Sequence, residues 1–210
     1  MKELDLLKKD WQKSANSFEQ VSEIEIYKMI HKKSSSIVKW ILIISIVEVL
    51  LWTCLSVCFN SDDYLIKMNH PELIQYFEVF AYFNYGVILF FIYLFYKNYI
   101  TISTTTSTKQ LMSDILKTRK TVQYYVWYNL GMLVVSLIIG FIIAFVYNPE
   151  MSVLKDKIAT NGKVMAITIG FLTLTTLVFL GAFWLFYRVV YGILLRRLHA
   201  NYKELKKIDL

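Results

Sequence analysis

Glu48 is the residue whose type and position most strongly suggest chemistry. It lies about eleven residues into a long apolar run, which at 1.5 Å per helical residue places it roughly 16 Å along, near the midplane of a bilayer. A carboxyl group at that depth is costly, so it must be protonated, paired, or turned towards protein or water. Its neighbours at helical spacing include Ser45, Trp52 and Ser56, which form one polar stripe.

Further polar residues fall at a similar depth in three other apolar runs. Together with Glu48 they define a candidate intramembrane polar layer: Asn84, Ser136, Thr175 and Thr176. Two functions fit such a layer. Either it binds a proton, an ion or a small solute, or it joins the helices through hydrogen bonds between a neutral Glu48 and an Asn, Ser or Thr side chain.

The sequence carries no catalytic, metal-binding or nucleotide-binding motif. GxSxG, HExxH, P-loop and GxGxxG patterns are all absent. Cys54 and Cys58 share one helix face at a spacing that hinders a disulfide, and we interpret them as small residues packing against a neighbour. The distribution of basic residues predicts an orientation with His70 on one side of the membrane and His31 and His199 on the other. We therefore expect no enzyme activity, no metal site and no cofactor.

Four apolar runs must position these residues. Of the 210 residues 56% are hydrophobic and 16% aromatic, and the mean hydropathy is +0.45, which is more apolar surface than a soluble chain of this length can bury. Each run is long enough to cross about 30 Å of hydrocarbon as a helix. The predicted spans are residues 37–59, 75–96, 122–147 and 164–187.

These runs predict an all-α membrane protein with four transmembrane helices in an antiparallel bundle. We expect three parts: a cytoplasmic helical segment, residues 1–36; a transmembrane domain, residues 37–192; and a cytoplasmic amphipathic tail, residues 193–210.

Basic residues predict the orientation. The N-terminal segment, the middle loop and the C-terminal tail carry eight, five and six Lys or Arg residues, whereas the other two loops together carry four. The positive-inside rule then places both termini in the cytoplasm, and we expect a bacterial inner membrane. The lysines flank spans and form no separate basic domain, so we expect attraction to anionic lipid and no nucleic-acid binding.

Aromatic residues agree with this orientation, because many of them fall at the predicted inner boundary, where amphipathic rings favour the headgroup layer. They are Trp40, Tyr93, Tyr96, Tyr99, Tyr124, Tyr125, Trp127, Tyr128, Trp184, Tyr187 and Tyr191.

Three cytoplasmic segments are predicted to be amphipathic helices. The first carries an apolar stripe at Leu4, Leu7 and Trp11, and after a polar break Ser22–Glu25 has the form of a capping box. Ser107–Gln110 is a second possible capping box. The tail has a stripe of its own, at Leu194, Leu198, Tyr202 and Leu205. Such segments could pack on each other, lie on headgroups, or bind a soluble partner, for which residues 1–35 are the candidate.

Small residues mark candidate packing faces. Gly140 and Ala144 repeat at four-residue spacing on the third span, and Gly170 and Gly181 lie on one face of the fourth. Stripes of this kind let helix backbones approach closely, either within one chain or between two copies in a homo-oligomer.

Four stretches resemble a family of uncharacterised bacterial four-span membrane proteins: Leu6–Trp11, Glu25–Ser36, Leu116–Thr121 and Tyr191–Lys207. The resemblance covers most of the chain and implies the same topology. Members of that family often carry the label beta-carotene monooxygenase. Carotenoid cleavage enzymes hold iron with a histidine cluster, and three histidines divided by a membrane cannot supply one, so the sequence speaks against that label.

Three functions remain as hypotheses. The first is a non-enzymatic regulatory or scaffolding protein that docks a cytoplasmic partner, motivated by the amphipathic N-terminal segment. The second is a small transporter or channel that uses the polar layer around Glu48. The third, a lipid-modifying enzyme, lacks any nucleophile or metal constellation.

Overall fold

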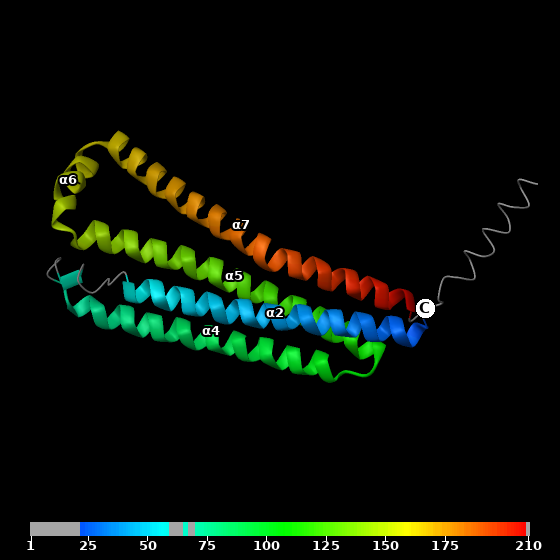
Figure 1. Ribbon diagram of the computed structural model, residues 1–210. Coiled ribbons are helices and arrows are strands. Elements are labelled where there is room, and N and C mark those ends of the chain that lie inside the picture. The colour runs from blue at the N-terminus through cyan, green and yellow to red at the C-terminus, as the bar shows by residue number, and fades with distance from the viewer. Residues whose placement is uncertain (1–21, 59–64, 67–69, 209–210) are drawn as a thin grey trace, which may run out of the picture.

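The computed structural model describes residues 22–58, 65–66 and 70–208, and within these residues it contains helices and no strand. Four long helices make up most of it, with a short helical connection between the last two, and Figure 1 shows how they are arranged. The elements are α2 (Glu23–Cys58), α4 (Glu72–Thr104), α5 (Thr108–Tyr147), the 3₁₀ helix η1 (Pro149–Met151), α6 (Ser152–Thr160) and α7 (Gly162–Ile208).

The four long helices form one antiparallel bundle. Each is long and apolar enough to cross a membrane. α2 contacts α4 and α7, and α5 contacts the same two helices, so the four form a closed ring of neighbours. The predicted fold class, an all-α bundle of four membrane-spanning helices, is confirmed. The predicted stripe at Leu4, Leu7 and Trp11 lies outside the described residues.

Two predicted capping boxes mark helix starts, and one of them forms. The Ser22 backbone N–H donates to the Glu25 carboxylate at 3.0 Å, and the Glu25 N–H donates to Ser22 Oγ at 3.3 Å, so each residue caps the other. α5 begins as predicted, with Ser107 at its N-cap, but no side chain caps it. The carbonyl of Ser107 instead accepts from the Leu111 N–H at 2.9 Å, which is an ordinary helical bond.

A hydrophobic core lies at one end of the bundle. This end holds the start of α2, the α4–α5 connection and the end of α7; we name it the basic end for the many Lys and Arg residues near it. All four long helices contribute buried side chains to the core: Ile30, Val38, Ile102, Leu111, Ile115, Leu198 and Leu205. The amphipathic segments of the described chain therefore pack on each other, which was one of the three predicted alternatives.

All four long helices extend beyond the predicted spans. α2 continues without a break through Ser34–Ser36, and α7 continues through residues 192 and 193. The predicted boundaries between the transmembrane domain and its extensions are therefore not breaks in the helices. Span and extension are continuous helices that pack along one another.

Hydrogen bonds between helices fix their register. Asn201 Nδ2 donates to Ser34 Oγ at 3.0 Å, and both residues are buried. Lys39 lies five residues after Ser34 on α2, and Arg196 lies five residues before Asn201 on α7. Because the two helices run antiparallel, these two cations lie at the same depth. On the other two helices Asn98 donates to Thr121 at 3.3 Å, which brings the neighbouring Lys97 and Lys120 close to a common level.

Each of these two pairs of cations marks one depth on its two helices, as at the edge of a hydrocarbon layer. Arg188 is the exception, about eight residues or 12 Å from Arg196 on α7. It is exposed, and its guanidinium lies 4.8 Å from the centre of the Trp184 ring, a cation–π contact that offsets part of the cost of its position.

At the opposite end α7 diverges from the other helices, and α6 connects it to α5 (Figure 1). Among the described residues of α7, every buried side chain lies at Tyr187 or later. The bundle is thus closed at the basic end and open at the α6 end, and the transition between the two lies beside Glu48.

Candidate functional site

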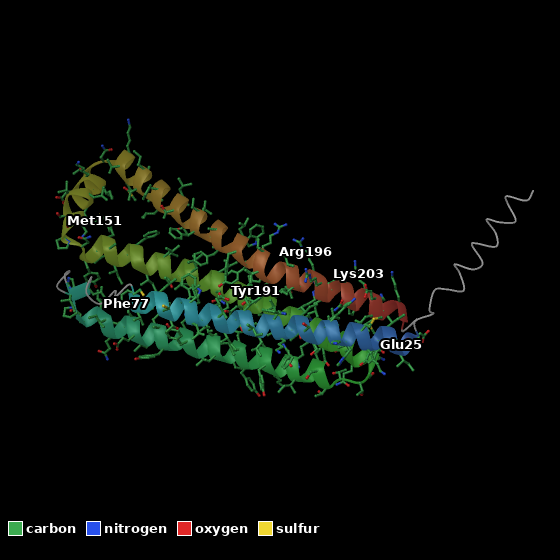
Figure 2. The ribbon with its side chains drawn as sticks, viewed as in Figure 1. Glu25, Phe77, Met151, Tyr191, Arg196 and Lys203 are labelled. Atoms are coloured by element: carbon green, nitrogen blue, oxygen red, sulfur yellow. The ribbon has the colours of Figure 1, made fainter. Side chains whose placement is uncertain are left out.

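Glu48 lies at the centre of a buried hydrogen-bonded cluster. Its side chain is 7% exposed. Oε2 accepts from the Tyr125 hydroxyl at 3.0 Å and from the Tyr191 hydroxyl at 2.9 Å, and Oε1 accepts from the Tyr187 hydroxyl at 2.5 Å. α2 therefore supplies the acid, while α5 and α7 supply three hydroxyl donors; Figure 2 labels Tyr191 near the middle of the bundle. We name these four residues the Glu48 cluster.

Aromatic packing holds the three tyrosines in place. Each tyrosine is at most 4% exposed. The Tyr125 ring meets the Tyr191 ring edge-on at 5.8 Å, and Tyr187 stacks with Tyr191 at 6.0 Å between centres. Phe95 of α4 closes the cluster, with its ring 5.4 Å from Tyr125 and edge-on to it. Rings fixed in this way hold their hydroxyls on the carboxyl group at little entropic cost.

Three hydroxyl donors suit a group that only accepts. An ionised carboxylate has two oxygens and about four lone-pair sites and no proton to donate. In the Glu48 cluster both oxygens are bonded and at least one lone pair on Oε1 remains free. The arrangement can therefore stabilise a negative charge in an apolar region. The free lone pair can still accept a proton, or one more hydrogen bond from a cationic ligand.

Two cavities adjoin Glu48 from different sides. A cavity of about 600 Å³ lies between α2 and α7, and Glu48 is the one charged residue among the described residues that line it. The other lining side chains are apolar or aromatic and include Ile44, Val47, Leu51, Trp52, Phe183 and Phe186. A second cavity, of about 240 Å³, is lined by residues of all four long helices. Its polar members besides Glu48 are Asn84, Tyr85, Tyr125, Asn129, Ser136 and Tyr187.

The structure brings three residues of the predicted polar layer together and leaves two aside. Glu48, Asn84 and Ser136 line the smaller cavity. Asn84 accepts a hydrogen bond from Tyr128 at 2.9 Å and makes none to Glu48. Thr175 and Thr176 do not line that cavity; each hydroxyl donates at 2.9 Å to a carbonyl of its own helix. The partners of Glu48 are tyrosines, where the structural interpretation expected Asn, Ser or Thr.

Sequence reasoning did not identify Tyr125, Tyr187 and Tyr191 as partners of Glu48. They were assigned to an aromatic belt at the membrane surface, yet all three are buried inside the bundle. The assignment failed because the fourth span was ended at Tyr187, whereas α7 continues and carries Tyr191 one turn further along the same face. The spacing of four between Tyr187 and Tyr191 was the available signal, since it places both hydroxyls on one side of a helix.

Among the described residues, no neighbouring helix approaches the predicted packing glycines closely. A Cβ atom added to Gly140, Gly170 or Gly181 would meet no atom of another helix within 4 Å. These positions therefore do not bring two helix backbones together within one chain. Cys54 and Cys58 are likewise exposed on α2, so the neighbour that the sequence interpretation gave them is not found among the described residues.

The histidines lie apart, and the described part of the chain contains no group of three or more His, Cys, Asp or Glu side chains that could hold a metal ion. His70 bonds to Glu72 at 2.7 Å. His199 accepts from Arg119 at 2.9 Å near the basic end. Burial lowers the pKa of His199 below its ordinary value of 6.5, and the positive charges of Arg119 and Lys203 lower it further.

Comparison with known proteins gives a family without an assigned activity. No curated protein and no solved structure matches the chain. Residues 24–210 match a family described as Domain of unknown function (DUF8845). The matched region includes the Glu48 cluster and all of the four long helices except Glu23, the first residue of α2, and the chain therefore belongs to the DUF8845 family.

Proposed function

We propose that this protein is a small non-enzymatic membrane carrier that binds an apolar organic cation at Glu48. One observation supports the proposal above all: three tyrosine hydroxyls fix the carboxyl group of Glu48, which is the one charged group that the described residues contribute to the walls of the two cavities. Within the described part of the chain, no acid, lysine, arginine or histidine other than Glu48 lines either cavity.

The chemistry of the walls selects the ligand class. A single carboxylate in an apolar region is unstable without a counter-charge, and a cation with an apolar body supplies that charge while it covers the surrounding hydrophobic surface. Trp52, Phe183 and Phe186 add aromatic surface to the larger cavity, and cations are attracted to the faces of such rings. A neutral or anionic ligand would leave the carboxylate unmatched.

Glu48 lies between the two cavities, so a ligand bound to it could pass from one cavity to the other. This position supports a carrier more than a protein that only binds the ligand. The same carboxyl group faces the larger cavity between α2 and α7 and the smaller one inside the bundle. Since a bare charge is costly at this depth, a proton would replace the cation when it leaves. The outcome is exchange of one cation for one proton at a single carboxyl group.

Uptake into proteoliposomes tests this function. Ethidium is a suitable probe, because it is an aromatic monocation and becomes fluorescent when it reaches DNA trapped inside the vesicles. We expect saturable uptake with the unchanged protein and background uptake with Glu48→Gln. Glu78→Gln is the matched control: Glu78 is exposed on α4 and lines neither cavity, so uptake should be unchanged. Background uptake with the unchanged protein would exclude the carrier function, and equal saturable uptake with Glu48→Gln would exclude Glu48 as its binding group.

A second function, docking of a soluble partner, is supported by the packed basic end. The helices there form a rigid platform whose exposed faces carry many cations, including Lys32, Lys33, Lys109 and Lys203. Deleting residues 1–35 would also remove Ile30 and Ser34 from the core, so a deletion of residues 1–21 is the cleaner test. Loss of captured proteins on this deletion would support docking, and an unchanged set would exclude it for that segment.

The location is part of the same proposal. We place the basic end in the cytoplasm of a bacterium, with the four long helices in the inner membrane and both termini inside. Fifteen Lys or Arg residues of the described chain lie in or near the basic half, against Lys155, Lys157 and Lys163 at the α6 end.

A further inference from the structure

A separate groove lies between α2 and α7 at the basic end, away from the Glu48 cluster. It has a volume of about 640 Å³. Three cations line it, Lys32 and Lys33 from α2 and Arg197 from α7, beside the apolar side chains of Met29, Ile37 and Ala200. Among the residues that the structure describes, no acidic side chain lines it. The groove therefore combines a concentrated positive charge with an apolar floor.

The register of the helices gives the depth of this groove. Lys39 and Arg196 stand at one level, which we take as the edge of the hydrocarbon layer. Lys32 and Lys33 lie six to seven residues outside that level on α2, about 9–11 Å along the helix, and Arg197 lies just beyond it on α7. The headgroup layer extends about 5–8 Å beyond the hydrocarbon on each side, so Arg197 lies within it. The backbones of Lys32 and Lys33 lie just outside this layer, and their long side chains can reach its phosphates.

We propose that this groove is a binding site for an anionic phospholipid, whose phosphate lies among Lys32, Lys33 and Arg197. Arg197 suits this role because its guanidinium can donate two parallel hydrogen bonds to a phosphate, while the lysines supply charge. Ile37 lies at the membrane side of the groove, and on the same face of α2 the apolar surface continues to Ile44. An acyl chain can follow that surface into the bilayer, which a free phosphate cannot use.

The purified full-length chain in a neutral detergent is the material for the test, and thermal unfolding against added lipid is the measurement. We expect phosphatidylglycerol to stabilise the protein at a far lower concentration than phosphatidylcholine. Replacing one cation with Gln should weaken the phosphatidylglycerol effect about fivefold, since each Lys or Arg near an anionic surface contributes about that factor. The triple variant Lys32→Gln, Lys33→Gln, Arg197→Gln should show no preference between the two lipids.

A charge-matched control separates the groove from general basicity. The triple variant Lys109→Gln, Lys117→Gln, Lys120→Gln removes the same charge from α5, from exposed residues outside the groove, and should keep the preference for phosphatidylglycerol. Glycerol phosphate, which has no acyl chain, should not stabilise the protein. Equal losses in both triple variants would overturn the proposal, and so would full stabilisation by glycerol phosphate, which would assign the groove to a soluble anion.

Discussion

Tyr187 of α7 donates its hydroxyl hydrogen to Glu48 of α2 at 2.5 Å, although 139 positions separate the two residues in the sequence. Tyr125 and Tyr191 also donate to this carboxyl group. On α2 itself the neighbours of Glu48 in sequence are mostly aliphatic, so its polar partners come from other helices. The cluster also lies where the closed basic end gives way to the diverging α6 end. A single site thus links α2, α5 and α7 and adjoins both cavities.

Substitution of Glu48 should separate the stability of the bundle from its proposed function. In Glu48→Gln the amide can still accept from one tyrosine and donate to another, so we expect less than about 1 kcal/mol of destabilisation. Glu48→Leu leaves three hydroxyls without their acceptor. It should cost about 2 kcal/mol, because an interhelical hydrogen bond in a membrane averages about 0.6 kcal/mol. Denaturant unfolding in detergent measures both, and equal stability of the three proteins would show that the cluster contributes nothing to the fold.

Removal of single tyrosine hydroxyls should have smaller effects. Tyr125→Phe, Tyr187→Phe and Tyr191→Phe each keep the ring packing and remove one donor, so each should lose about 0.6 kcal/mol. Tyr124→Phe is the matched control, because Tyr124 neighbours Tyr125 but is 66% exposed. The same unfolding assay should show no change for this control. If Tyr124→Phe were as destabilising as the other three, the hydrogen bonds to Glu48 would not be the cause.

Much of this architecture could be predicted from the sequence, because an apolar run of about 20 residues is the length of helix that crosses a bilayer. The depth of Glu48 on α2 followed from the same count. The partners of Glu48 could not be derived in this way. The end of each span was set from composition alone, and this does not show which residues of different helices lie at the same depth. Ending the fourth span at Tyr187 placed that residue at the membrane surface, while the packing of α7 on α2 places it beside Glu48.

The predicted depth of Thr175 and Thr176 differs from the structure for the same reason. Thr175 and Thr176 were counted to the level of Glu48 from the predicted ends of the fourth span. In the structure Tyr187, eleven residues beyond Thr176, reaches Glu48, so the threonines lie towards the diverging end of α7. Register between helices depends on side-chain contacts far apart in sequence, and no local pattern contains it.

His199 should make stability depend on pH. Its pKa in the folded protein lies below the ordinary value of 6.5, through burial and the charges of Arg119 and Lys203. Its contribution to stability is therefore fully present above pH 6.5 and is lost as the pH falls towards the lower folded pKa, because the unfolded chain then binds the proton more readily. Comparing Tm at pH 7.5 and pH 5.5 should show a smaller drop for His199→Gln than for the unchanged protein. An equal or larger drop in the variant would contradict this role.

Reporter fusions should establish the proposed orientation. A fusion after Asp156, in α6, is expected to be active only with a reporter that works outside the cytoplasm. A fusion after Lys207, at the end of α7, should be active only with a cytoplasmic reporter. The opposite pattern would reverse the orientation, and activity of both fusions on one side would be incompatible with four spans.

Equilibrium binding tests the central claim about Glu48 most directly. Tetraphenylphosphonium and tetraphenylborate share one shape and carry opposite charges, so a difference between them reports charge recognition alone. Titration of each ion into the purified protein in neutral detergent, followed by calorimetry, should show saturable binding of the phosphonium and none of the borate. Glu48→Gln should abolish phosphonium binding, and Glu78→Gln should leave it unchanged. Comparable binding of both ions, or unchanged phosphonium affinity in Glu48→Gln, would contradict the assignment of Glu48 as the counter-charge.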